Sequence, residues 1–149
     1  MAISIIPFSQ EDLEGAKNVI LSGLKEYGFS YNKEYDSDLD DPIKYYIETG
    51  GMFYVLKDDE TIIGTVAVIN KGNHVAELKR MYVDKNHQGK GYGSMLLNKA
   101  VDFSKQNGFT KLEFETNKKF LKAHKFYQDR GFVIVSDDER SYYMEKDLL

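Results

Sequence analysis

The hydrophobic positions along the chain follow two different periods. Short stretches with alternating or continuous apolar residues predict seven strands, at 2–8, three within 52–83, 111–116, 132–135 and 141–148. Apolar residues at intervals of three and four predict four helices, at 13–27, 42–46, from the glycines at 89–93 to Gly108, and 117–130. The polar stretch 30–41 predicts a loop. The order β-α-α-β-β-β-α-β-α-β-β indicates a mixed α/β fold, and we expect one domain over residues 1–149.

The boundaries of these elements have their own signals. Ser9 followed by Asp12 matches a capping box before the first helix, and Gly28 marks the end of that helix. Asp41 followed by Pro42 is typical of the start of a short helix. Polar turns near Asp58–Asp59 and Gly72–Asn73 separate the three central strands.

The third central strand changes its apolar face partway along. Ala76 and Leu78 put the apolar side chains on even positions, whereas Met81 and Val83 put them on odd positions. Because side chains of a regular strand alternate strictly, this switch indicates a β-bulge near Lys79–Arg80. A strand end that is buried on both faces would explain the pattern equally well.

Three glycines at alternate positions, Gly89, Gly91 and Gly93, stand directly before the third predicted helix. Glycine is costly to order, so three of them at a helix start indicate that the bare backbone has a role there. The first N–H groups of a helix have no partner within the helix, and its dipole favours an anion. The spacing fits neither the dinucleotide fingerprint nor the nucleotide P-loop, since Ser94 and Gly91 stand where those motifs need other residues.

Composition narrows the classes of partner and site. The 149 residues carry a net charge of −4, yet residues 71–130 hold 13 Lys and Arg against 6 Asp and Glu. A basic segment in an acidic chain suggests a local anionic ligand rather than nucleic acid, although uneven surface charge is the plainer reading. There is no cysteine, and the three histidines are far apart, so we expect no disulfide and no metal site.

The apolar stretches are too short for a signal peptide or for a membrane span of about 18 residues. We therefore expect a cytoplasmic protein that has no contact with a membrane.

The segment VDKNHQGKGYG resembles the acyl-CoA signature of the GNAT N-acetyltransferases, Gln/Arg-x-x-Gly-x-Gly/Ala. The matching residues are Gln88, Gly89, Lys90, Gly91, Tyr92 and Gly93. The preceding AELKRMYV is similar to the family's bulged strand, and AHKFYQDRGF, residues 123–132, is similar to its later helix with a tyrosine before Gly-Phe. The resemblance implies a GNAT-like central sheet of about seven strands, flanked by about four helices, with a bulged fourth strand.

The resemblance also implies a set of residues that contact acetyl-CoA. The backbone around Met81 and Val83 would pair with the pantetheine arm, and residues 88–94 would wrap the pyrophosphate through main-chain N–H groups. The full implied set is Met81, Tyr82, Val83, Gln88, Gly89, Lys90, Gly91, Tyr92, Gly93, Ser94 and Asn117. For Asn117, a helix N-cap is the alternative role.

Two residues match catalytic positions of the family. Tyr127 aligns with the tyrosine that often protonates the departing CoA thiolate, and its alternative role is a core aromatic. Glu77 resembles a strand carboxylate that serves some members as general base through water, and its alternative role is a solvent-facing strand residue.

The implied activity is direct transfer of an acetyl group from acetyl-CoA to a primary amine of a small molecule, protein or peptide, without a metal. The acidic loop 30–41 would suit a cationic amine, but a plain solvated loop explains it too. A non-catalytic acyl-CoA sensor is the alternative function, and a nucleic-acid-binding module is less compatible with the charge. A homodimer is common in the family. The acceptor stays open at this point.

Overall fold

The computed structural model describes residues 2–149, whose seven strands form one sheet in the order β1-β2-β3-β4-β5-β7-β6. Neighbouring strands are antiparallel except β4 and β5, which are parallel. The strands are β1 (Ile3–Pro7), β2 (Met52–Asp58), β3 (Thr61–Gly72), β4 (Val75–Val83), β5 (Lys111–Asn117), β6 (Val133–Asp137) and β7 (Ser141–Asp147). The expected mixed α/β fold with a seven-stranded sheet is confirmed.

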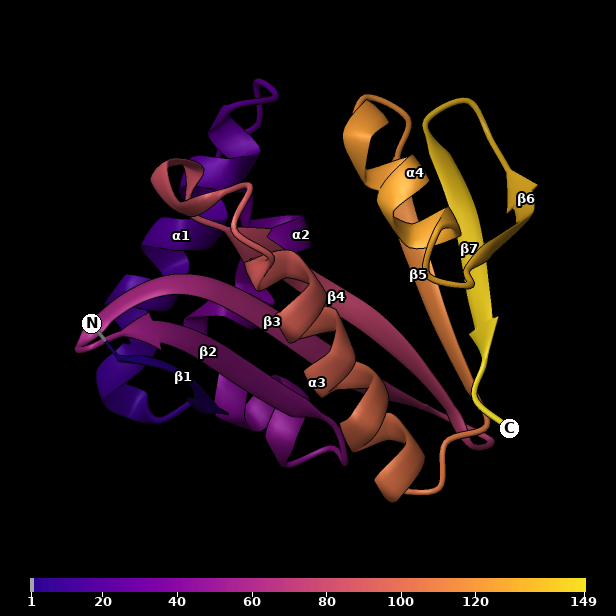
Figure 1. Ribbon diagram of the computed structural model, residues 1–149, viewed down its shortest axis with the longest axis horizontal. Coiled ribbons are helices and arrows are strands. Elements are labelled where there is room, and N and C mark those ends of the chain that lie inside the picture. Colours follow the sequence, from indigo (N-terminus) through magenta and orange to yellow (C-terminus); the bar gives the residue numbers. More distant parts are fainter. Residues whose placement is uncertain (1) are drawn as a thin grey trace.

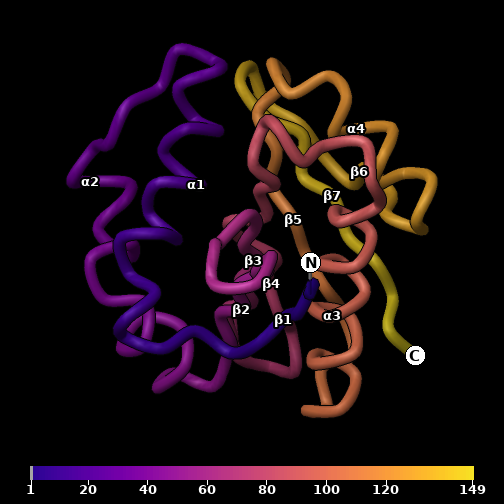
Figure 2. The backbone as a smooth tube through the Cα atoms, turned by 60° about the vertical axis from the view of Figure 1, so that its left-hand side comes forward, coloured from indigo at the N-terminus to yellow at the C-terminus, as the bar shows by residue number. Residues whose placement is uncertain are grey.

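Helices cover both faces of this sheet. The α-helices are α1 (Leu13–Lys25), α2 (Lys33–Asp36), α3 (Tyr92–Gln106) and α4 (Leu121–Gln128). Shorter turns of helix are η1 (Gln10–Asp12), η2 (Ser37–Asp40), η3 (Ile43–Ile47) and η4 (Lys85–His87). Figure 2 shows α1 and α2 on one side of the central strands and α3 on the other. Within residues 2–149, no helix has the length and apolar character needed to cross a membrane.

Each face of the sheet has its own hydrophobic core. The larger core joins α3 and α4 to the sheet and includes Leu78, Leu96 and Tyr127. The smaller core joins α1, η2 and η3 to the other face and includes Ile20 and Tyr46. We call these the α3 face and the α1 face.

A β-bulge in β4 explains the change of apolar face. Thr65 of β3 pairs with Tyr82 and Ala67 pairs with Lys79, so that one residue of β3 lies opposite two residues of β4. Arg80 takes the left-handed conformation there, with φ 54°, and its carbonyl accepts a 2.7 Å hydrogen bond from the Thr65 hydroxyl. Met81 therefore packs on the α3 face and Tyr82 on the α1 face. The predicted bulge is confirmed.

The parallel strands β4 and β5 separate soon after they meet. Among the described residues, their ladder comprises three pairs, from Val75–Lys111 to Glu77–Glu113. Beyond Glu77 the two strands diverge, so that β5, β7, β6 and α4 stand apart from the rest of the sheet (Figure 1). The backbone of β4 from the bulge onward thus borders a gap in the sheet.

Several boundary predictions are confirmed. The Asp12 carboxylate accepts hydrogen bonds from the backbone N–H and the hydroxyl of Ser9, at 3.0 and 3.2 Å. Gly28 follows α1 with φ 84°, and the turns at Asp59 and Asn73 also have positive φ. These are short-range features, which neighbouring residues decide.

Two predictions are wrong. Residues 30–41 are not a loop throughout, because they form α2 and η2; Asn32 starts α2 by accepting a hydrogen bond from the Glu34 N–H. The last helix begins at Leu121 rather than 117, since Asn117 still pairs with Ser141 in the sheet. In both places contacts with distant residues override the local pattern.

Two glycines let α1 lie close to the sheet. A Cβ atom added to Gly15 would lie 2.8 Å from the Ile62 side chain, and one added to Gly23 would lie 2.5 Å from Cδ1 of Tyr82. Both approaches are shorter than van der Waals contact. The fit of α1 against β4 therefore depends on the missing side chain at Gly23.

We expect Gly23→Ala to destabilise the protein, because the added methyl group must displace the half-buried Tyr82 ring. Overpacking of this kind costs about 1–3 kcal/mol, which outweighs the gain of up to about 1 kcal/mol in helix propensity. Thermal unfolding should show a lower Tm than that of the native protein. The matched control is Ser22→Ala, which changes an exposed neighbour on the same helix. A Gly23→Ala variant as stable as this control would contradict the prediction.

Candidate active site

The glycine segment forms an open turn between β4 and α3. Gly89 and Gly91 have φ of 79° and 85°, and Gly91 is the N-cap of α3. Apart from the residues directly before and after each glycine, no heavy atom of residues 2–149 lies within 4 Å of the Cβ position at either residue. The turn therefore exposes bare backbone directly before the first N–H groups of a 15-residue helix, an arrangement that suits an anion.

The other residues of the turn have distinct roles. The Gln88 side chain donates a 3.1 Å hydrogen bond to the Val83 carbonyl, which ties the turn to the end of β4. Lys90 is exposed, whereas the Tyr92 side chain is buried in the core of the α3 face. Gly93 lies against α4, where an added Cβ would be 3.5 Å from the Phe126 ring. Only the backbone of Tyr92 and Gly93 can serve a ligand in the turn.

Arg130 is a residue of this site that the sequence analysis missed. Its guanidinium donates a 2.8 Å hydrogen bond to the Ser94 hydroxyl and stacks 3.7 Å from the centre of the Phe126 ring. It thus brings a positive charge from the end of α4 to the first turn of α3. The sequence offers no periodic signal for this pairing, since the two residues are 36 positions apart.

Tyr127 lies on the α3 face beside the bulged strand. The side chain is buried, and its hydroxyl is 3.5 Å from the sulfur of Met81. The ring packs 4.3 Å from Phe114 on β5, so it sits where β4 and β5 diverge. Burial raises the pKa of the Tyr127 hydroxyl. At neutral pH this hydroxyl is therefore a proton donor.

Residues 81–83 do not all face the same way. Met81 and Val83 pack on the α3 face, on which Tyr127 also lies. The Tyr82 side chain lies against α1 on the opposite face. Only the Tyr82 backbone is thus available to a ligand on the α3 face.

Asn117 ends β5 and is not a helix N-cap. Its side-chain oxygen accepts a 2.9 Å hydrogen bond from the Lys119 N–H, while Phe120 precedes α4. The neighbouring Thr116 is buried, and its hydroxyl has no hydrogen-bond partner within residues 2–149. The end of β5 therefore carries two adjacent polar side chains, one of which lacks a protein partner.

Glu77 lies on the α1 face, opposite to Tyr127. It is half-buried, and burial raises its pKa above the ordinary 4.5, although Lys79 and Lys71 oppose this shift. Glu115 and Glu113 on β5 also raise the pKa of Glu77. A carboxylate with a raised pKa is a stronger proton acceptor than an exposed one.

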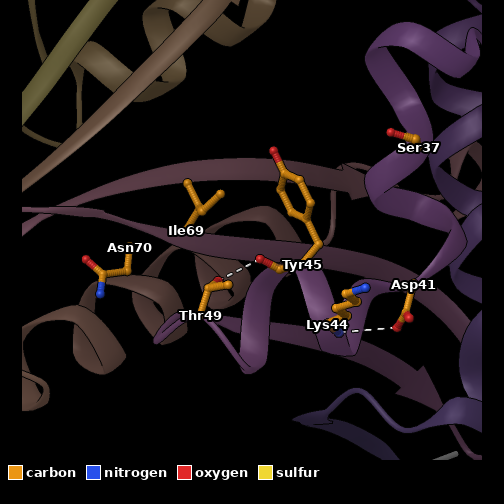
Figure 3. Close-up of a pocket in the computed structure, with 7 residues that line it drawn as sticks. All are labelled: Ser37, Asp41, Lys44, Tyr45, Thr49, Ile69 and Asn70. Atoms are coloured by element: carbon orange, nitrogen blue, oxygen red, sulfur yellow. Dashed lines mark hydrogen bonds between the residues drawn. The ribbon is translucent and has the colours of Figure 1, made fainter.

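Two recesses adjoin Glu77 on the α1 face. One, of about 280 Å³, has Glu77 itself in its wall, with Lys71, Glu113, Glu115 and Tyr143. The other, of about 480 Å³, lies between β3 and the helical turns η2 and η3 (Figure 3). Its lining residues are Ser37, Asp41, Lys44, Tyr45, Thr49, Ile69 and Asn70.

Ile69 pairs directly with Glu77 across β3 and β4, so the two side chains project side by side from the same face. The larger recess, which we call the η3 recess, therefore borders Glu77. Despite the carboxylates on this face, no group of three or more His, Asp or Glu side chains among residues 2–149 is placed to hold a metal ion.

The acidic segment 30–41 is only partly exposed to solvent. Asp36 and Asp38 are buried, and both form ion pairs with Arg80, at 2.9 and 2.7 Å. Asp40 pairs with Lys17 at 3.1 Å and accepts a hydrogen bond from Tyr31. Asp36 and Asp38 are therefore not solvated charges, whereas Glu34, Asp40 and Asp41 are exposed.

Comparison with known proteins identifies a family and related proteins for this chain. The model of the acetyltransferase (GNAT) family matches residues 20–132. The chain is 34% identical over 101 residues to an N-acetylaspartate synthetase of Xenopus tropicalis, a match that covers 66% of the chain and 37% of that protein. It is 30% identical over 112 residues to streptothricin acetyltransferase A of Bacillus subtilis, covering 75% and 64%. The chain therefore spans less than two thirds of either relative.

Solved structures share the fold along the whole chain. A GNAT-family acetyltransferase from Staphylococcus aureus superposes with a TM-score of 0.91 at 26% identity, over 99% of this chain and 100% of that one. The PaiA N-acetyltransferase of Thermoplasma acidophilum, solved in complex with coenzyme A, gives 0.82 at 24% identity, over 99% of each chain. The second comparison, at this identity, concerns the fold alone.

We expect Gly91→Glu to abolish binding of acetyl-CoA in calorimetric titration. The new side chain would bring bulk and negative charge to the open turn at the start of α3. The matched control is Gly108→Glu, because Gly108 has φ 81° and equally open surroundings at the other end of α3. The control imposes the same backbone strain and charge but should bind as the native protein does. Equal binding by both variants would contradict an anion site in the turn.

Proposed function

Since the chain belongs to the acetyltransferase (GNAT) family, we propose that it transfers an acetyl group from acetyl-CoA directly to a primary amine. GNAT acetyltransferases use acetyl-CoA as the acetyl donor. The observation that carries the proposal is that an open glycine turn at a helix N-terminus and a buried tyrosine border the same gap between β4 and β5. An anion site thus follows the end of β4, and a proton donor lies beside Met81 of the same strand.

The residues around the turn fit an acyl-CoA. Main-chain N–H groups from Gln88 to Ser94 would bind the diphosphate, and the positive φ of Gly89 and Gly91 keeps side chains out of its way. Arg130 and Lys90 add positive charge. The backbone of Met81, Tyr82 and Val83 would pair with the pantetheine arm along the gap, and Asn117 would offer a polar side chain from the end of β5.

Acetyl-CoA supplies the thioester. In the proposed transfer, the amine nitrogen forms a bond to the acetyl carbon, the carbon–sulfur bond breaks, and the amine loses a proton. The Tyr127 hydroxyl would protonate the departing thiolate, and its burial keeps that proton in place at neutral pH. Glu77 would accept the amine proton through water, and its raised pKa favours this role.

The acceptor would approach from the α1 face. Both recesses next to Glu77 open on this face, whereas Tyr127 and the glycine turn lie toward the α3 face. Glu77, Glu113 and Glu115 outnumber Lys71 in the smaller recess, which favours an amine that arrives as a cation. The relatives are named for acceptors as different as aspartate and streptothricin, so the class of acceptor is decided by experiment.

We also propose a cytoplasmic location, which the absence of cysteine from the sequence suits. A single domain over residues 1–149 and a homodimer stay predictions. So does the lack of a nucleic-acid partner, which the net charge of −4 favours.

The test is acetyl transfer from acetyl-CoA to a panel of amines: spermidine, kanamycin, L-aspartate, a lysine-containing peptide and streptothricin. We expect turnover with at least one, and Tyr127→Phe should lower kcat about 100-fold. Calorimetry should give the variant an unchanged Kd for acetyl-CoA, because only the hydroxyl is removed. Binding of acetyl-CoA without turnover on any amine would instead support a non-catalytic sensor.

We expect the pH profile of kcat/KM for the best acceptor to show an acidic limb set by Glu77. The carboxylate accepts a proton only when ionised, and its raised pKa places the loss of activity at a higher pH than an ordinary glutamate would. Glu77→Gln should lower kcat/KM about 100-fold and remove this limb. Glu139→Gln, at an exposed position between β6 and β7, is the control. An unchanged limb in Glu77→Gln would exclude Glu77 as the base.

A further inference from the structure

We propose that Arg80 is a positioning residue that fastens the walls of the η3 recess to the bulge of β4, and thereby holds the acceptor site in register with the cofactor strand. This inference rests on the proposed acetyl transfer, since it assigns the η3 recess to the acceptor. Arg80 itself does not line the recess. It would act through the segments that do.

The guanidinium of Arg80 forms a buried, forked ion pair with the segment before η3. Its Nε and Nη2 donate to the two carboxylate oxygens of Asp38, at 3.0 and 2.7 Å. Nη2 also donates to Asp36 at 2.9 Å and to the Tyr35 carbonyl at 3.3 Å. All three charged side chains are largely buried: 12% of Arg80, 10% of Asp36 and 7% of Asp38 is exposed to solvent. Burial alone would lower the pKa of Arg80, but the hydrogen bonds and the charges of these carboxylates hold this pKa above its ordinary value.

Asp38 connects this ion pair to η3. The hydroxyl of Tyr46, a fully buried residue of η3, donates a short hydrogen bond to the Asp38 carboxylate. Burial, with the charge of Asp38, raises the pKa of Tyr46, so its proton stays in this bond. One carboxylate thus accepts from the β4 bulge and from η3 together.

Each anchor of the network is next to a residue that lines the η3 recess. Ser37 lies between Asp36 and Asp38, and Tyr45 precedes Tyr46. Figure 3 shows the Tyr45 ring between Ile69 on one side and Ser37 on the other. The distances of Ser37 and Tyr45 from β4 therefore both depend on the Arg80 guanidinium.

The backbone of Arg80, unlike its side chain, shapes the part of β4 that is proposed to contact acetyl-CoA. Its φ of 54° and the hydrogen bond from Thr65 define the bulge, after which Met81 turns to Tyr127 and the gap. A change of the side chain leaves this backbone arrangement available. The side chain should therefore affect the acceptor and spare the cofactor.

Lysine is not an equivalent residue at this position. Its ammonium would keep the charge that balances Asp36 and Asp38, but it cannot span both oxygens of Asp38 and reach Asp36 in one plane. The walls would then be ordered only when the acceptor binds, at a cost in affinity. Arg80→Lys is thus the variant that tests position rather than charge.

The experiment compares Arg80→Lys and Tyr46→Phe with the native protein. The matched control is Lys57→Met, which breaks the buried Lys57–Asp12 pair of 2.9 Å on β2. This pair lies at the end of β2 away from the recess, since Lys57 pairs with Ile62 whereas Met52 pairs with Val68. Calorimetry gives the Kd of acetyl-CoA, steady-state kinetics with the best amine of the panel gives KM, and hydrogen exchange reports on residues 33–47.

We expect both variants to raise the acceptor KM, about tenfold for Arg80→Lys, while the Kd of acetyl-CoA stays within about twofold. Exchange should accelerate across residues 33–47 and remain unchanged in α3. Lys57→Met should lower Tm without changing KM or exchange in that segment. An equal rise in KM in this control, or unchanged KM and exchange in both variants, would overturn the proposal. Accelerated exchange with no turnover on any amine, even by the native protein, would instead overturn the proposed function, and with it the assignment of the recess to an acceptor.

Discussion

The bulge at Arg80 is the constraint on which the rest of the site depends. One extra residue in β4 changes the face of every side chain that follows, so Met81 and Val83 pack toward α3 while Tyr82 and the Arg80 side chain point toward α1. The same strand then diverges from β5 and borders the gap beside Tyr127. A regular strand in this place would keep one apolar face and would present neither arrangement.

The proposed anion site depends on a different feature, namely residues that have no side chain. Gly89 and Gly91 adopt a conformation that other residues enter only at a cost, and their surroundings are open. The helix dipole and the free N–H groups of α3 then act on the same point as Arg130. The turn directly follows β4, and for this reason the diphosphate and the acyl end of one extended ligand would lie along one line.

The two proposed proton-transfer groups are separated by the sheet. Tyr127 lies on the α3 face and Glu77 on the α1 face, and burial raises the pKa of both. The consequence is opposite for the two groups: the phenol keeps its proton at neutral pH, whereas the carboxylate becomes a better acceptor than an exposed glutamate. An acid and a base on opposite faces suit two substrates that meet across the gap between β4 and β5.

The sequence by itself determined the features that neighbouring residues control. Periodicity predicted all seven strands and the bulge, and the glycine spacing predicted an open turn before α3. Tertiary structure decided what distant residues do to one another. Asp36 and Asp38 looked like solvated charges, yet both are buried and paired with Arg80, which is 44 and 42 positions away. Arg130 reaches Ser94 across 36 positions for the same reason. The spacing of apolar residues shows which face of a helix or strand is buried. It contains no information about which distant residue pairs with a charged side chain, and for this reason the ion pairs could not be predicted.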